Sequence, residues 1–172
     1  SFLSNGETKL LTDKLQNVQM LFAEFGSHTE KPYVEITSRV HTQNRASLQS
    51  TGSAKEDPAT LKFFTRATEL LPTDGIVKET ATKAITGANS DLEKVRAIYD
   101  WIVTNAWREP KIRGCGEGDI KTMLETGNLG GKCADINALF VGLCRSVGIP
   151  ARDVYGLRLA PSAFQYKELS GN

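Results

Sequence analysis

The strongest constraint in this sequence is an apolar stripe that repeats at helical spacing and ends on a glycine. Its members predict one continuous buried helix face: Ile136, Leu139, Phe140, Leu143, Cys144 and Val147. Gly148, Ile149 and Pro150 follow at once, which is typical of a left-handed cap, its hydrophobic contact and a stop. The sequence therefore predicts an amphipathic helix over 133–147, followed by a strand over 151–159.

The segment before this helix, 114–131, is rich in glycine and is interrupted by a short helical stretch over 119–125. Glycine permits positive φ angles and lets other groups approach the backbone closely. A phosphate-binding loop would show Gly-x-x-x-x-Gly-Lys-Ser/Thr, whereas Gly131 and Lys132 are followed here by Cys133. The pattern argues against a nucleotide site of that kind.

Cys133 opens the predicted helix directly after Gly131 and Lys132. A thiol at a helix start faces unpaired backbone amides and the positive end of the helix dipole, which favour the thiolate. Lys132 adds a positive charge if its side chain turns toward the thiol. The glycines leave room for a carbonyl group, and the Cys133 amide could stabilise the oxyanion formed on attack. These features indicate nucleophilic acyl chemistry; the alternative is a small apolar residue at a helix start.

Three cysteines are too few for a disulfide framework. They form no Cys-x-x-Cys pair, and His28 and His41 lie far upstream, so the spacing argues against a zinc site. Cys144 falls in the apolar stripe and is expected in the core. Cys115 lies in the glycine-rich segment, where it is a free thiol near the site, a disulfide partner of Cys133, or neither.

Two further helices are expected upstream. Asp74 can cap a helix that ends at Gly87, with a buried stripe of Val77, Ala81, Ala84 and Ile85. Ser90 and Glu93 form a capping box at the start of the next helix, which ends before Pro110 because proline disfavours helical geometry at the preceding residue. The buried face of that helix is predicted to contain Leu92, Val95, Ile98, Ile102 and Ala106.

The N-terminal third permits two interpretations. Leu11, Leu15, Val18, Phe22 and Phe25 fall at helical spacing. The alternative, which we favour, is a hairpin of a strand over 18–25, a loop over 26–32 and a strand over 33–40. Residues 51–58 are polar and contain glycine and proline, so a loop is expected there.

Three segments carry a family resemblance. The first, Gly130 to Arg152, has a Gly-x-Cys at a helix start and, after the helix, Gly-Ile-Pro-Ala-Arg entering a strand. Arg96–Asn105 and Arg113–Ile120 precede it as a helix and a connecting loop. In this order they resemble bacterial members of the transglutaminase-like superfamily. The resemblance covers about residues 72–160 and implies an α+β papain-like core, in which Cys133 is the nucleophile and its helix packs on an antiparallel sheet.

Members of that family carry a catalytic His on a strand after the nucleophile helix and an Asp on the next strand. This sequence has no His after Cys133, and Asp153 comes too early to correspond to the family's Asp. We therefore expect a fragment of a longer protein, with a partial β-rich domain over 1–71 and the N-terminal half of the core over 72–172. His41 could act as the base only if the N-terminal hairpin folded over the site; otherwise it is an exposed strand residue.

The resemblance implies thiol-dependent acyl chemistry on amide or peptide substrates, which requires no metal or organic cofactor. We expect hydrolysis, as in a protease or amidase, rather than amine cross-linking, because many bacterial members resemble thiol proteases. The chain alone is expected to be inactive for want of the His. Two alternatives stay open: a non-catalytic binding module that lacks a complete triad, and a redox thiol protein that uses Cys115 and Cys133.

Charge and hydropathy bear on the partners. The formal net charge is +1, which gives no broad field that would favour a nucleic acid or an anionic membrane, and no apolar stretch approaches the roughly 20 residues of a transmembrane helix. We expect a protein or peptide substrate and a homodimer formed through an exposed sheet edge. The sequence begins with Ser1 and shows no basic-then-apolar leader. It indicates no compartment and leaves a periplasmic or secreted location open.

Overall fold

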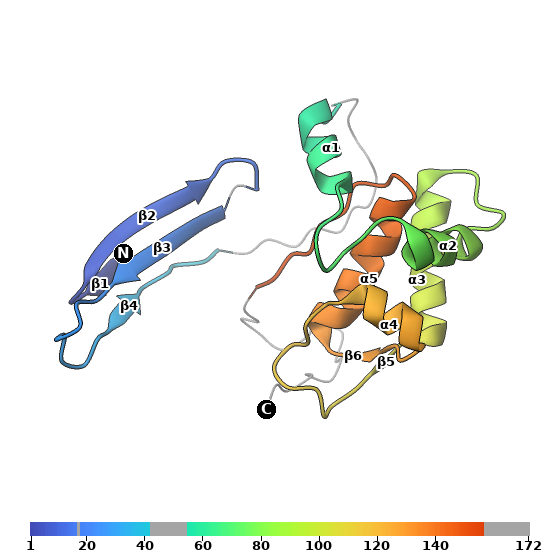
Figure 1. Ribbon diagram of the computed structural model, residues 1–172. Coiled ribbons are helices and arrows are strands. Elements are labelled where there is room, and N and C mark those ends of the chain that lie inside the picture. Colours follow the sequence, from blue (N-terminus) through green and yellow to red (C-terminus); the bar gives the residue numbers. More distant parts are fainter. Residues whose placement is uncertain (17, 42–54, 157–172) are drawn as a thin grey trace. The chain divides into compact units, whose positions relative to one another are not determined.

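The structure is a computed structural model that describes residues 1–16, 18–41 and 55–156 (Figure 1). The chain divides into two compact units, 1–55 and 56–172. The described strands of the first unit form two antiparallel pairs, whereas the second unit is mainly helical. This mixture of helices and small sheets confirms the α+β class, and whether residues 1–71 form a partial domain stays a prediction.

The first unit pairs its strands differently from the expected hairpin. β2 (Glu7–Asp13) pairs with β3 (Val18–Glu24), whereas β1 (Phe2–Ser4) pairs with β4 (Val34–Ile36). The strand over 18–25 is thus essentially correct, but its predicted partner is wrong, and β4 is shorter than the expected strand over 33–40.

The reason for this difference is the short turn between β2 and β3. The Asp13 carboxylate accepts hydrogen bonds from the amides of Leu15 and Gln16, at 2.9 and 3.0 Å. An Asp side chain that bonds the backbone two or three residues on stabilises a tight turn. β2 (sequence ETKLLTD) shows no alternation of apolar and polar residues, so the sequence carries no period-2 signal for this strand.

The described part of the first unit buries no side chain completely. In the β2–β3 pair, Leu11 lies opposite Met20, and Lys9 lies opposite Phe22. The apolar side chains among them, Leu11, Met20 and Phe22, are about half exposed. Two-stranded pairs have little independent stability in water. The proposed homodimer through a sheet edge stays a prediction.

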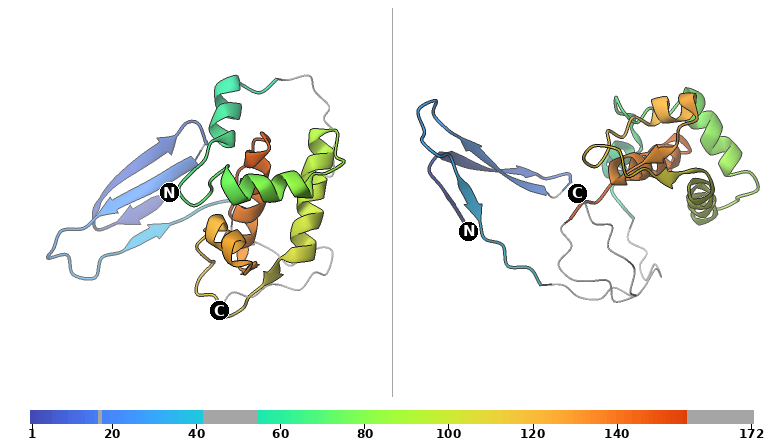
Figure 2. Two further views of the ribbon diagram at one scale, coloured as in Figure 1. Left: turned by 45° about the vertical axis from the view of Figure 1, so that its right-hand side comes forward. Right: turned by 90° about the horizontal axis from the view of Figure 1, so that it is seen from below.

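The second unit is built around one helix that the others surround. α5 (Cys133–Ser146) packs against α2 (Gly75–Ala84), α3 (Asp91–Asn105) and α4 (Ile120–Thr126), with α1 (Pro58–Thr65) near its C-terminal end (Figures 1 and 2). The largest side chains that are fully buried between these helices are Ile98, Ile120, Leu139, Leu143, Val77 and Cys144. The prediction that Cys144 belongs to the core is therefore confirmed.

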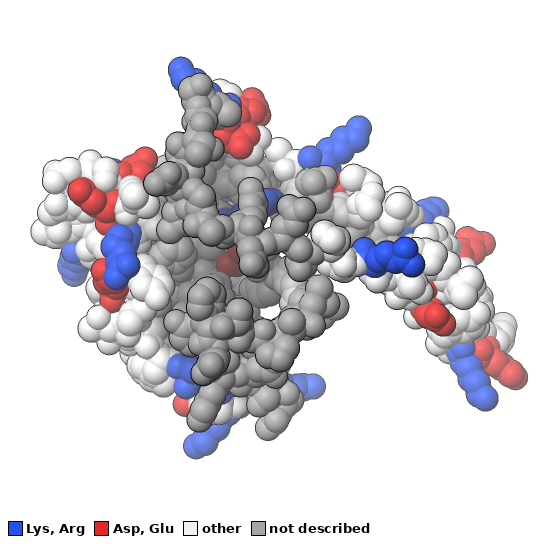
Figure 3. Space-filling model, turned by 180° about the vertical axis from the view of Figure 1, so that it is seen from behind, with Lys and Arg blue, Asp and Glu red and all other residues white. Residues whose placement is uncertain are grey.

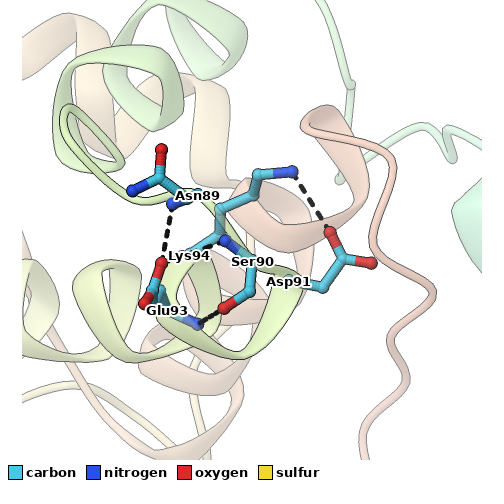
Figure 4. A network of polar contacts seen from close by, with 5 residues as sticks. All are labelled: Asn89, Ser90, Asp91, Glu93 and Lys94. Atoms are coloured by element: carbon cyan, nitrogen blue, oxygen red, sulfur yellow. Dashed lines mark hydrogen bonds and ion pairs between the residues drawn. The ribbon is translucent and has the colours of Figure 1, made fainter.

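The capping box at the start of α3 is present as the sequence predicts (Figure 4). The Glu93 amide donates to Ser90 Oγ at 3.2 Å, and Glu93 Oε2 accepts from the Ser90 amide at 3.0 Å. Lys94 forms an exposed ion pair with Asp91 at 3.1 Å. At the start of α2, by contrast, Asp74 occupies the N-cap position without a side-chain cap bond.

The expected buried face of α3 needs one correction. Ile98 and Ile102 are buried, but Leu92 is 79% exposed. Leu92 lies in the first helical turn, and the expectation that it belongs to the buried face is wrong. The helix ends at Asn105, several residues before Pro110.

The C-terminal end of α5 agrees with the predicted cap. Gly148 has a φ of 83°, in the left-handed region. Its amide donates to the Arg145 carbonyl, and the Ile149 amide donates to the Cys144 carbonyl, both at 3.0 Å. The described residues that follow, 151–156, form no strand; the remainder of the expected strand, 157–159, lies outside the described residues.

Two short strands connect the helices of the second unit to its glycine-rich segment. β5 (Trp107–Arg108) follows α3 and pairs in parallel with β6 (Gly130–Gly131), which leads into α5. They are the only strands among residues 55–156, so the antiparallel pairs of the described chain all belong to the first unit. The pair fixes the residues that precede α5 to the end of α3.

The surface carries charges of both signs. On the face shown in Figure 3, the basic and acidic side chains of the described residues are interspersed and form no large area of one sign. None of the helices formed by the described residues is both long and apolar enough to span a membrane.

Candidate active site

Cys133 is the first residue of α5, and the backbone before it is held by the β5–β6 pair. The Glu109 amide donates to the Gly131 carbonyl at 2.9 Å, and the Ile136 amide donates to the Lys132 carbonyl at 3.0 Å. The chain thus enters the helix in a defined geometry. The Cys133 thiol is exposed and free, as expected for a group that meets a substrate.

A second segment, 115–118, lies against this helix start. The Ala134 amide donates to the Cys115 carbonyl at 2.8 Å, which brings the backbones of Cys115 and Cys133 close together. Cys115 is also exposed and free. The structure therefore places Gly131, Lys132 and Cys115 beside Cys133, and the roles proposed for them stay predictions.

The carboxylate of Asp135 holds the two segments together. Its Oδ1 accepts from the amides of Glu117 and Gly118, both at 2.9 Å, and its Oδ2 accepts from the Lys132 amide at 2.9 Å. The residue is only 6% exposed. A buried carboxylate needs such charge-assisted hydrogen bonds because its desolvation is otherwise very costly. The sequence interpretation had not singled out this residue.

Three glycines are required by close contacts at this site. A Cβ on Gly116 would overlap the Asp135 carboxylate, and one on Gly131 would lie 2.5 Å from Asp135 Cβ. Gly116 also has a φ of 95°, which disfavours other residues. A Cβ on Gly130 would lie 2.6 Å from Nε1 of the Trp107 indole. The glycine-rich sequence therefore lets a carboxylate and an indole ring pack on the backbone that leads to Cys133.

The backbone amides around Cys133 are used unequally. The amide before it, on Lys132, is bound by Asp135, and the amide after it, on Ala134, is bound by the Cys115 carbonyl. Among the residues that the structure describes, the Cys133 amide has no acceptor. The Cys133 carbonyl accepts from Asn137 Nδ2 at 2.8 Å. An unengaged donor thus lies next to the exposed thiol, as an oxyanion site requires.

The segment after α5 returns toward the thiols. Partial burial raises the pKa of Tyr155, and the nearby acidic groups Asp153, Cys133 and Cys115 add to the effect. Partial burial also raises the pKa of Asp153, while Arg145 opposes it. Arg145 is held by the Ala151 carbonyl, which accepts from its Nε at 2.9 Å. Tyr155 is 64% exposed, and the charges of both thiols contribute to its raised pKa.

The other site residues considered from the sequence are the Lys132 side chain and the two histidines. The Lys132 side chain forms no ion pair or hydrogen bond within the described part of the chain. His28 and His41 are exposed and belong to the first unit, so residues 56–172 contain no histidine. Among the described residues, no three side chains of His, Cys, Asp or Glu are grouped so that they could hold a metal ion.

Two hollows flank the start of α5. One, of about 380 Å³, lies between the glycine-rich segment and α4 and is lined by Arg113, Thr122 and Asn128 among others. The other, of about 400 Å³, lies between α3 and α5 and is lined mainly by aromatic and aliphatic side chains, including Trp107 and Phe140. Cys133 lines neither hollow; the residues that connect them to the start of α5 are Gly130 and Asp135 in the first and Ile136 and Asn137 in the second.

Comparison with known proteins adds an independent finding. The family model of the transglutaminase-like superfamily matches residues 78–169. A protein of Haemophilus influenzae, described only as uncharacterised, is 35% identical over 146 residues, which is 81% of this chain. The chain spans 40% of the length of that relative. No solved structure matches the chain.

Proposed function

The chain belongs to the transglutaminase-like superfamily, and we propose on this premise that Cys133 is the nucleophile of thiol-dependent acyl chemistry on amide or peptide substrates. The observation that carries the proposal is the position of its exposed thiol at the start of α5, beside a backbone amide with no acceptor among the described residues. Thiol and donor are both needed at one substrate carbonyl.

The proposed reaction has two steps. The Cys133 sulfur attacks the carbonyl carbon, the oxygen becomes an oxyanion facing the Cys133 amide, and collapse breaks the C–N bond. The leaving nitrogen takes a proton and a thioester remains on Cys133. Water then adds to the thioester carbonyl carbon, the C–S bond breaks, and a carboxylic acid and the Cys133 thiol are released; an amine in place of water gives a new amide and the thiol.

Both steps need an acid–base partner, and residues 56–172 contain no histidine for this role, because the chain's two histidines are His28 and His41. The family resemblance implies a His and an Asp on later strands. Loss of one triad member typically lowers turnover on the order of 10⁴-fold. We therefore propose that this chain alone turns over a plain amide very slowly. If turnover is instead fast, His41 is the first residue to test as the base.

Hydrolysis of a protein or peptide substrate is the favoured outcome, as in a protease or amidase, because bacterial members of the family resemble thiol proteases. Amine cross-linking is the same chemistry with another acceptor. The proposal requires no metal or organic cofactor, since the thiol, the amide donor and a base are sufficient for acyl transfer.

A non-catalytic binding module is the second candidate. The observation that favours it is that the sequence of residues 56–172 contains no histidine that could act as the base for Cys133. In such a module the hollows beside α5 would hold a peptide without cleaving it. The two candidates differ in whether Cys133 accepts an acyl group.

The test is a burst experiment with p-nitrophenyl acetate, whose leaving group needs no proton. The nucleophile proposal predicts release of about one p-nitrophenolate per chain, followed by slow deacylation. Cys133→Ser should abolish the burst. Cys115→Ser should retain it, since only the backbone carbonyl of Cys115 contributes to the site. A burst of unchanged size in Cys133→Ser would contradict the proposal and favour the binding module.

A further inference from the structure

We propose that Asp135 is a positioning residue, whose buried carboxylate orients the backbone at Lys132 so that the amide and the thiol of Cys133 meet one substrate carbonyl. The inference rests on the proposed function of Cys133 and assigns a residue that sets the geometry of that site. Asp135 touches neither the thiol nor a substrate in this assignment; it acts through the backbone.

The first argument is the number and origin of its bonds. Three backbone amides from two separate segments donate to this one side chain, each at 2.9 Å. Two come from the glycine-rich segment, at Glu117 and Gly118, and one comes from Lys132 directly before the nucleophile. Because the residue is 6% exposed, these bonds are shielded from water and are correspondingly strong.

The second argument concerns which amide is left for a substrate. Asp135 engages the amide of Lys132, and the Cys115 carbonyl engages that of Ala134. The amide of Cys133 lies between them and has no acceptor among the described residues. The peptide group that carries the Lys132 amide is also held at its Gly131 carbonyl by the Glu109 amide, and the Lys132 carbonyl accepts from the Ile136 amide. Without the carboxylate, the Lys132 amide would lose its only acceptor among the described residues, and the direction of the Cys133 amide would be fixed less tightly. A misplaced donor stabilises an oxyanion poorly.

The third argument is the close packing of glycines on the carboxylate. Both Gly116 and Gly131 approach Asp135 so closely that a Cβ on either would overlap it. The site therefore has room for an aspartate and no larger group. All three partners of the carboxylate are backbone N–H donors. An asparagine at this position would therefore direct its NH₂ group, which is also a donor, at a backbone N–H.

Asp135→Asn is the informative variant, with Asp119→Asn as its matched control. Asp119 is also a helix-capping carboxylate: it accepts from the Thr122 amide at 3.1 Å and from Thr122 Oγ1 at 2.7 Å at the start of α4. It makes no bond to residues 130–136. The control thus removes a carboxylate cap in the same unit without touching the backbone of Cys133.

Two reactions of the same thiol are then compared in the full chain, each quantified at Cys133 by peptide mapping. Acetylation by p-nitrophenyl acetate passes through an oxyanion, whereas alkylation by iodoacetamide does not. The positioning role predicts that Asp135→Asn slows acetylation at least tenfold, since loss of one oxyanion donor costs about 10²–10³-fold, and slows alkylation less than about threefold. Asp119→Asn should leave the ratio of the two rates unchanged.

Equal slowing of both reactions, or no change in either, would overturn the positioning role. If Asp135→Asn does not fold, Asp135→Ser replaces it under the same criterion, because a hydroxyl with room for water introduces no opposed donor. Failure of both to fold while Asp119→Asn folds would show a purely structural residue. Lack of acetylation of the unaltered chain would instead contradict the proposed function of Cys133.

Discussion

Iodoacetamide should react with Cys133 far faster than with Cys144 in the native chain. Cys144 is 1% exposed, and burial raises its pKa to about 11. At pH 8 only about one Cys144 thiol in a thousand is then ionised, against about a quarter of ordinary thiols with a pKa near 8.5. Since the thiolate is the reactive form, ionisation alone makes Cys144 about 200-fold slower. The lack of access to the buried sulfur slows it further.

The assay is limited alkylation at pH 8, followed by quenching, digestion and mass spectrometry of the cysteine-containing peptides. We expect Cys133 to be labelled at least about a hundredfold faster than Cys144, in line with the difference in thiolate fraction. Cys115 is exposed as well and serves as the reference for an accessible thiol outside a helix start. In denaturant, where burial is lost, the three cysteines should react at similar rates.

Equal labelling of Cys133 and Cys144 in the native chain, or preferential labelling of Cys144, would refute the reasoning. Such a result would mean that the core around α5 opens readily or that the helix start is covered. A rate for Cys133 no higher than that of Cys115 would show that exposure alone, and not the helix position, governs its reactivity.

The same burial predicts that alkali lowers the free energy of unfolding. Between the unfolded pKa of Cys144, near 9, and its folded pKa, about 11, only the native state keeps the proton, so up to about 3 kcal/mol of stability should be lost as the pH rises. Urea unfolding of Cys144→Ala should lack this part of the pH dependence. Ser90→Ala should lower the free energy of unfolding by about 1 kcal/mol in thermal unfolding because it removes a cap bond. The control is Thr104→Ala, on the exposed face of the same helix, which should change this free energy by less than about 0.5 kcal/mol. Equal effects of the two variants would contradict the capping role. Leu139→Ala should cost about 2–5 kcal/mol in denaturant unfolding, since the side chain is fully buried; a loss below about 1 kcal/mol would show that the core differs from the one described.

The helices could be predicted from the sequence because their signals are local. The capping box of Ser90 and Glu93 and the cap at Gly148 each lie within a few neighbouring residues, and both are present. In the predicted stripe of α5, Leu139, Leu143 and Cys144 are buried, and the other three members are partly buried against the core. Leu92 was misassigned because the helical period gives a direction but not the point where the neighbouring helices end.

Strand pairing and the surroundings of the thiol could not be predicted in the same way. The partners of β3 and β4 depend on turns and contacts between distant segments, and the period of a strand does not name its partner. The role of Asp135 in the fold depends on amides that lie 17 and 18 residues away in the chain. The sequence identified Cys133 through its helix start. The local signal for Asp135 is limited to an acidic residue in the first turn of α5, whose bond to the Lys132 amide spans three residues.

The most direct test of the central claim is the location of the acyl group after reaction with p-nitrophenyl acetate. The reaction is quenched in acid during the burst, and the thioester is mapped by digestion and mass spectrometry. We predict a single acetyl group on the peptide that contains Cys133, lost on treatment with hydroxylamine. An acetyl group found instead on Cys115, or spread over lysine side chains with none on Cys133, would contradict the assignment of Cys133 as the nucleophile.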